Sequence, residues 1–118
     1  MSPADLKRRT MAFALRVLRL ADSLPRTLSG RTVAGQMARS GCSVAANYRA
    51  ALRGKSRADF INKITVVLEE ADETAFWIEI TGRSGMIPAK RLEPLQTEAE
   101  ELTKIFNATR ATARNHKS

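Results

Sequence analysis

The sequence predicts an all-α protein, folded as an antiparallel up-down-up-down four-helix bundle. Two stretches, residues 61–78 and 92–109, carry apolar side chains at alternating steps of three and four, as in helices that pack in a bundle. The sequence contains no alternating β-branched run and no Asn-Gly hairpin turn, so strands are not expected. A length of 118 residues suits a single domain, residues 1–118, with one core.

The first helix is expected over residues 3–24. Ser2 can cap it, Pro3 suits the first helical position, and Asp5 can complete a capping box. Pro25 disfavours helical geometry in the residue before it and so ends the helix.

The apolar side chains of this first helix are more numerous than a bundle requires. On a helical wheel they cover about 220°, whereas a helix on the surface of a bundle needs a stripe only slightly wider than about 100°. The excess indicates a second apolar contact with another subunit. The alternative is a helix that lies deeper in its own core.

The second helix is expected over residues 32–53, after a connection at 25–31 that is rich in turn residues. It is rich in alanine and glycine, so another backbone can approach it closely. Four uncharged polar side chains at steps of 4, 3 and 4 line one edge of its apolar arc: Gln36, Ser40, Ser43 and Asn47. We expect this polar line to bond to a neighbouring helix or to backbone carbonyls. A role in reading nucleic-acid bases is the alternative.

Two long helices are expected to follow, over residues 57–81 and 88–113. The third begins with a second capping box, formed by Ser56 and Asp59. Pro94 lies inside the fourth, so that helix either begins there or kinks.

Basic residues are concentrated in the first half of the chain. The net charge is +8, but residues 1–57 hold twelve Lys and Arg against two Asp, while residues 58–118 hold eight against ten Asp and Glu. This asymmetry favours an acidic partner such as nucleic acid, although basicity can also serve solubility alone. The expected binding surface comprises Arg8, Arg9, Arg16, Arg19, Arg39, Arg49, Arg53, Lys55 and Arg57. Several of these could instead pair with acidic residues of the last two helices.

The sequence does not predict an enzyme, and no metal or cofactor is expected. The single histidine, His116, lies near the C-terminus, so it offers no dependable partner for Cys42 or a serine. Cys42 lies among small residues and is interpreted as a buried filler. Glu69, Glu70 and Glu73 cluster without a histidine and are interpreted as a solvated or ion-pairing face. One cysteine, no signal peptide and no apolar run of membrane length point to the cytoplasm.

A helix-turn-helix DNA-binding unit is an alternative for residues 33–52. Gly41 would then occupy the turn and Ser43 would begin the recognition helix. The small alanine that this unit needs before the turn is out of place, because Met37 stands there. If Gly41 is in a turn, Gly41→Ala should be severe, whereas a continuous helix should tolerate it or gain stability.

The segment from Gln36 to Asn47 (Gln-Met-Ala-Arg-Ser-Gly-Cys-Ser-Val-Ala-Ala-Asn) resembles the Gln-x-x-Arg-Ser-x-x-Ser-(Val/Ile)-x-x-Asn signature of a bacterial four-helix-bundle family. That family includes proteins encoded in intervening sequences of 23S ribosomal RNA genes. The chain is also similar to the accessory variability determinant of diversity-generating retroelements. The likeness continues from Phe13 to Pro25 and through residues 57–60 and 68–77.

The resemblance implies a homopentamer of four-helix bundles with a basic surface. It also implies binding to nucleic acid, as structured RNA or DNA, or to a partner that processes nucleic acid, such as a reverse transcriptase. A pure scaffold that docks a protein partner, without nucleic acid, is the remaining alternative.

Overall fold

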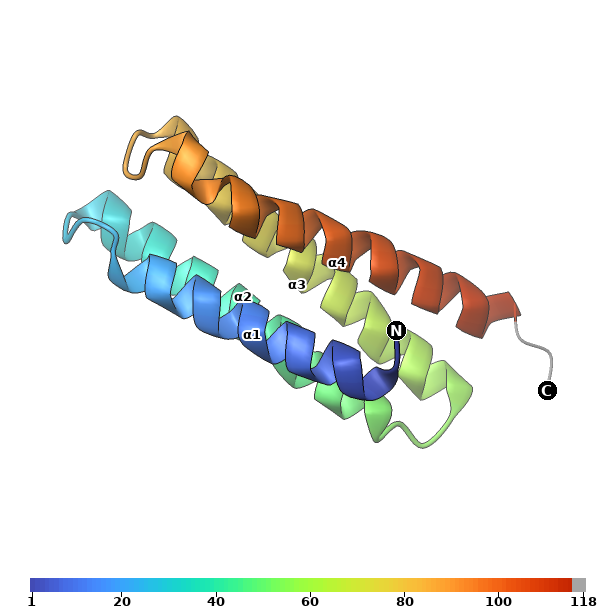
Figure 1. Cartoon of the computed structure of the whole chain (residues 1–118). Helices are drawn as coiled ribbons and strands as arrows, with labels where there is room; N and C mark the ends of the chain where they lie inside the picture. The colour runs from blue at the N-terminus through green and yellow to red at the C-terminus, as the bar shows by residue number, and fades with distance from the viewer. Residues whose placement is uncertain (116–118) are drawn as a thin grey trace.

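The computed structural model describes residues 1–115, which form an antiparallel four-helix bundle (Figure 1). The helices are α1 (Pro3–Asp22), α2 (Leu28–Leu52), α3 (Arg57–Arg83) and α4 (Ala89–Asn115). Each helix runs opposite to the one before it, and no strand occurs among the described residues. The predicted all-α, up-down-up-down fold is therefore confirmed.

Side-chain caps begin three of the helices. The capping box of α1 is complete, because Ser2 Oγ accepts from the Asp5 amide and the Asp5 carboxylate accepts from the Ser2 amide. Ser56 caps α3 by accepting from the Asp59 amide. The Asp59 carboxylate, however, accepts from the amide of Lys55 at 3.2 Å, so the predicted second capping box is shifted by one residue.

The second helix begins earlier than expected, at Leu28 instead of residue 32. Thr27 is its cap, and the Thr27 hydroxyl accepts from the Gly30 amide. A Cβ at Gly30 would lie 1.9 Å from the Pro25 carbonyl oxygen, so the chain can turn this tightly only with glycine there. The chain completes its turn before Leu28. Most of the expected connection at residues 25–31 therefore belongs to the helix.

The fourth helix passes through Pro94 without ending, so the expectation that the helix could begin at that proline is wrong. Proline has no amide to donate to the carbonyl of Lys90, four residues earlier. Both residues are exposed, so water can serve that carbonyl.

The second helix is continuous across Gly41, so residues 33–52 are not a helix-turn-helix. Gly41 is instead the place where α2 packs closely on α1, because a Cβ there would come within 2.7–3.1 Å of three atoms of the Val17 side chain. The expectation that a continuous helix would tolerate Gly41→Ala is therefore wrong as well. The cost comes from packing against α1 and not from a turn.

One core runs along the whole bundle. Its largest fully buried side chains come from all four helices and include Phe13, Met37, Ile64, Ile78 and Phe106. The Tyr48 and Phe106 rings pack with centroids 5.2 Å apart, which joins α2 to α4 across the core. None of the helices in the described chain is long and apolar enough to span a bilayer.

The apolar arc of α1 is wider than the core can cover. Phe13 and Val17 are fully buried, but Met11, Leu15 and Leu18 keep 42%, 45% and 37% of their surface exposed. The excess predicted from the sequence therefore lies on the outside of the single chain. The alternative of a helix that lies deeper in its own core does not apply to these three side chains.

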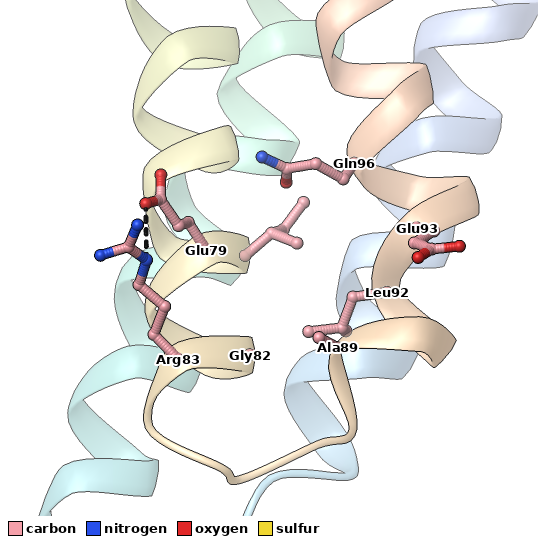
Figure 2. Close-up of a pocket in the computed structure, with 8 residues that line it drawn as sticks. Glu79, Gly82, Arg83, Ala89, Leu92, Glu93 and Gln96 are labelled. Carbon is pink, nitrogen blue, oxygen red and sulfur yellow. Dashed lines mark ion pairs between the residues drawn. The ribbon is translucent and has the colours of Figure 1, made fainter.

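Where α3 ends and α4 begins, a hollow of about 280 Å³ lies between the two helices (Figure 2). Gly82 lets the helices approach, since a Cβ there would lie 3.2 Å from the Leu92 side chain. Glu79 and Arg83 form an ion pair of 3.0 Å at one side of this hollow. Gln96 also lines it, and its buried Oε1 has no hydrogen-bond partner among the described residues.

Two glycines in α2 test the packing of α2 on α1. We expect Gly41→Ala to destabilise the protein by about 1–3 kcal/mol, because the new methyl group overlaps Val17. Gly35→Ala is the matched control: nothing lies within 4 Å of a Cβ at Gly35, so the change should stabilise the helix by about 1 kcal/mol. Urea unfolding measures both changes, and a stabilised Gly41→Ala would contradict the close contact.

Candidate nucleic-acid interface

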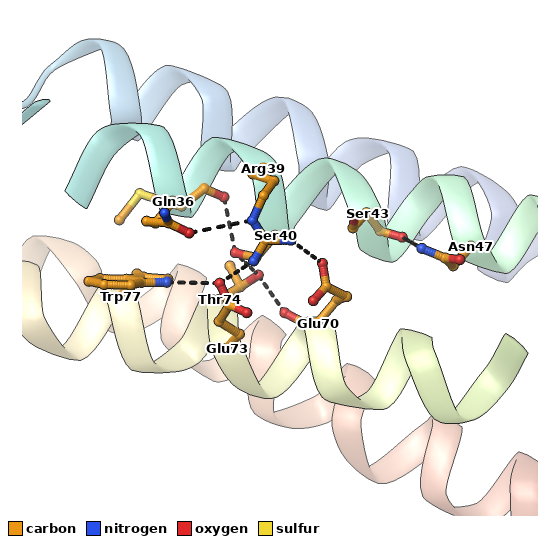
Figure 3. Close-up of polar contacts among 10 residues, drawn as sticks. Gln36, Arg39, Ser40, Ser43, Asn47, Glu70, Glu73, Thr74 and Trp77 are labelled. Carbon is orange, nitrogen blue, oxygen red and sulfur yellow. Dashed lines mark hydrogen bonds and ion pairs between the residues drawn. The ribbon is translucent and has the colours of Figure 1, made fainter. Parts of the chain in front are cut away.

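The polar line of α2 serves the packing of α2 on α3 at one position, Ser40 (Figure 3). Ser40 is fully buried, and its Oγ accepts a hydrogen bond of 2.8 Å from the Thr74 hydroxyl of α3. Ser40 Oγ in turn can donate to the Met37 carbonyl. A fully buried hydroxyl cannot reach a nucleic-acid base, so the expected structural role fits Ser40.

The other members of the polar line bond within their own helix. Asn47 donates to the Ser43 carbonyl at 2.9 Å, and the Gln36 side-chain oxygen accepts from Arg39 Nε at 3.4 Å. Gln36 is exposed, whereas Ser43 and Asn47 are half-buried beside α3. Two of the bonds made by the polar line are to backbone carbonyls, as expected from the sequence.

Arg39 connects α2 to the acidic face of α3. Its Nη1 donates to Glu70 at 2.8 Å, and its Nη2 forms an ion pair with Glu73. The same Glu73 carboxylate accepts from Trp77 Nε1 at 3.1 Å. Nη1 and Nη2 of Arg39 therefore both have carboxylate partners within the chain. This is the arrangement that the ion-pairing alternative for the basic residues describes.

Arg9 makes the corresponding connection between α1 and α4. Its Nε and Nη2 each reach one oxygen of Glu98 at 2.7 Å, and Nη2 also reaches Glu101 at 2.7 Å. A two-pronged arginine–carboxylate contact of this kind has a fixed geometry and is stronger than a single bond. Arg9 is half-buried, so like Arg39 it is engaged in holding helices together.

Hydrogen bonds lower the pKa values of two carboxylates, those of Glu73 and Asp59. Hydrogen bonds from Arg39 and then Trp77 lower the pKa of Glu73 below its ordinary value of 4.5. Hydrogen bonds from Lys63 and then the Lys55 amide lower the pKa of Asp59. Both carboxylates are therefore ionised at neutral pH, when they cancel part of the local positive charge.

Six of the nine predicted basic residues gather at one end of the bundle. Because the helices are antiparallel, the start of α1, the end of α2, the start of α3 and the end of α4 meet there (Figure 1). We call residues 1–9, 49–63 and 104–115 the basic end. The predicted residues within it that are exposed to solvent are Arg8, Arg49, Arg53, Lys55 and Arg57.

The basic end has a large surplus of positive charge. It contains eleven Lys and Arg but only two acidic residues, Asp5 and Asp59. Asp5 already pairs with Arg8 at 2.5 Å, and Asp59 pairs with Lys63 at 2.6 Å. Glu98 and Glu101 of α4, which pair with Arg9, lie nearby, but eleven cations against two carboxylates within these ranges still leave a strongly positive field at this end.

The structure separates the other predicted residues from this group. Arg16 and Arg19 lie in the second half of α1, toward the opposite end of the bundle. Arg19 is exposed and Arg16 is half-buried. The nine residues therefore do not form a single continuous surface.

Further cations of the basic end were not among the predicted residues. Lys7 lines a hollow together with Arg8 and Arg49, and Arg110 and Arg114 lie in the last turns of α4. The signal was present in the sequence. In an up-down-up-down bundle, basic residues at the end of the fourth helix must lie beside those that end the second.

An acid titration tests the contact between Arg39 and Glu73. Since folding lowers the pKa of Glu73, its carboxylate stabilises the native state above pH 4.5, and this contribution is lost as the pH falls through the lowered value. We expect Glu73→Gln to cost less than about 1 kcal/mol at neutral pH and nothing in strong acid. Urea unfolding against pH measures this, with Glu100→Gln, an exposed glutamate of α4, as the control. Equal pH dependence in both variants would contradict it.

Comparison with known proteins places this architecture in a family. The model of the 23S rRNA-intervening sequence protein family matches residues 4–108. A solved structure of similar fold is a protein of unknown function from the S23 ribosomal protein family of Bacteroides thetaiotaomicron. It has 33% sequence identity and a TM-score of 0.87, and the match covers 95% of this chain and 100% of that one. No curated protein matches the chain. The chain belongs to the 23S rRNA-intervening sequence protein family.

Proposed function

We propose that this protein is a non-enzymatic, oligomeric helical bundle that binds nucleic acid, as structured RNA or duplex DNA, through its basic end. The observation that carries the proposal is the charge surplus at that end, where Arg53 and Lys55 are exposed beside Arg8, Arg49 and Arg57. Phosphate contacts of lysine and arginine release counterions, so a group of such side chains binds nucleic acid without reading its sequence.

The chemistry of the described residues fits backbone binding better than base reading. No group of three or more His, Cys, Asp or Glu side chains that could hold a metal lies within residues 1–115. The ring contacts in this part of the chain, Tyr48 with Phe106 and Phe76 with Trp77, lie outside the basic end apart from the buried Phe106. The aromatic side chains of the basic end are the half-buried Phe60 and the fully buried Phe106, so this end offers many cations and little aromatic surface on which bases could stack.

We propose further that the protein forms a homopentamer and acts with a partner that processes nucleic acid, such as a reverse transcriptase. The resemblance of residues 36–47 to the signature of the bacterial four-helix-bundle family, which implies a homopentamer, supports this proposal. The exposed Met11, Leu15 and Leu18 also support self-association, because a helix in a monomer would gain by burying them. An assembly repeats the basic end in every copy, which multiplies weak phosphate contacts.

A protein-docking scaffold without nucleic acid is the second candidate. The same three exposed apolar side chains of α1 favour it, since an apolar patch of this kind marks protein interaction sites. The two candidates differ in their response to salt. A nucleic-acid-binding protein binds RNA more weakly as salt rises. A protein-docking scaffold does not bind RNA at any salt concentration.

Fluorescence anisotropy with structured RNA, duplex DNA and single-stranded DNA across a salt series tests the proposal. We expect affinity to fall linearly in log–log form, and we expect Arg53→Gln with Lys55→Gln to reduce the slope by about 2. The control is Lys90→Gln with Arg91→Gln, which removes the same charge at the opposite end of the bundle, from two exposed residues of α4. No binding at low salt, or equal loss in both variants, would overturn the proposed site.

A further inference from the structure

Two helices carry exposed stripes with the same spacing. The α1 stripe consists of Arg8, Met11, Leu15, Leu18 and Asp22. The α3 stripe consists of Glu69, Asp72, Phe76, Glu79 and Arg83. Both advance by steps of three, four, three and four, so each keeps to one side of its helix. All ten residues are exposed in the single chain.

When the two stripes are paired in order, the two end pairs and the middle pair match, while Met11 and Leu18 come level with the carboxylates of Asp72 and Glu79. Arg8 then faces Glu69 at one end, and Asp22 faces Arg83 at the other, so both ends carry opposite charges. In the middle Leu15 faces Phe76, which keeps 51% of its surface exposed. Because both helices rise about 1.5 Å per residue, the five pairs stay level along the whole contact.

Each stripe borders a hollow that can receive a side chain of the other stripe. Beside the α1 stripe lies a hollow of about 390 Å³ lined by Lys7, Arg8, Met11, Ala12, Leu15 and Arg49. Its floor is apolar and three cations line it, so it suits Phe76 and its acidic neighbour Asp72. Phe76 is level with Leu15 in the pairing and so meets this hollow.

The hollow beside the α3 stripe is the one between α3 and α4, which Glu79 and Arg83 line (Figure 2). Leu18 is level with Glu79 in the same pairing. One pairing therefore directs Phe76 to the first hollow and Leu18 to the second.

The stripes lie on different sides of the molecule. The first hollow is formed by α1 with α2, and the second by α3 with α4, so one chain cannot bring its own two stripes together. The helices α1 and α3 run in the same direction in the bundle. Copies related by rotation about an axis along the helices thus present α1 and α3 in parallel, as the pairing requires.

We propose that the α1 stripe of one copy docks in parallel on the α3 stripe of a second copy, with Phe76 and Leu18 entering the two hollows. Such a head-to-tail contact uses two different surfaces, so it adds copies until a ring closes. The proposal rests on the self-association proposed above and names the surfaces that carry it. It leaves Arg53 and Lys55 outside the contact and available to phosphates.

Complementation between two blocked variants tests the pairing. Leu15→Glu places a charge opposite the acidic stripe, and Phe76→Lys places a charge against Arg8 and Arg49. Both positions are exposed, so the fold should persist, which circular dichroism checks. In sedimentation velocity we expect an assembled wild type, two monomeric variants, and an equimolar mixture that associates again. One contact in the mixture is intact, and in the other the two changed residues face each other with opposite charges.

Other outcomes of this experiment overturn the pairing. If α1 stripes met each other in a two-fold dimer, Phe76→Lys would stay assembled and the mixture would form no new species. A monomeric wild type would overturn the pairing together with the proposed self-association. The anisotropy titration reports on the basic end separately, so loss of the pairing and loss of nucleic-acid binding can be told apart.

A charge exchange tests the register of the pairing. Glu69→Arg places two arginines face to face and should weaken association by at least about tenfold. Adding Arg8→Glu restores the opposite charges and should recover most of that loss. If the second change weakens association further, Arg8 does not face Glu69 and the register is wrong.

Discussion

The close contact between Gly41 and Val17 governs the arrangement of this bundle. With no side chain at Gly41, α2 lies directly on α1, and the methyl groups of Val17 fill the space that a Cβ would need. This contact directs one half of the α1 apolar arc into the core, including Phe13 and Val17. The other half, Met11, Leu15 and Leu18, is left outside. The exposed side chains remain because the apolar arc of α1 is wider than the face that α2 and the core can cover.

The arginines of the chain divide into two groups that composition cannot separate. Arg9 and Arg39 lie opposite glutamates of α4 and α3 and hold neighbouring helices together. Arg53, near the end of α2, is exposed at the basic end, where acidic residues are few. Which group an arginine joins depends on the helix that lies opposite. That is set by the register between helices, and no local pattern in one helix records it.

Local signals sufficed for the fold and for some details of the helices. The three-four spacing and the Ser2 cap predicted helices that the structure contains, because both depend on residues within a few positions of each other. The start of α2 was missed because it depends on Gly30 packing against the Pro25 carbonyl. Of the two alternatives for Pro94, a helix that begins there is excluded because α4 already begins at Ala89, and water can serve the exposed carbonyl of Lys90. The polar line indicated that Ser40 could bond to a neighbouring helix, but local patterns could not identify its partner, Thr74.

Topology links the basic end to assembly. In an up-down-up-down bundle α1 and α3 point the same way, so a parallel contact between them sets all copies in one orientation. Every basic end then lies on the same side of the assembly. A phosphate backbone that meets one copy also meets its neighbours, and the second contact is made at high effective concentration. In the proposed assembly, exposed cations such as Arg53 and Lys55 would together hold a phosphate backbone more firmly than one copy does, without any pocket for a base.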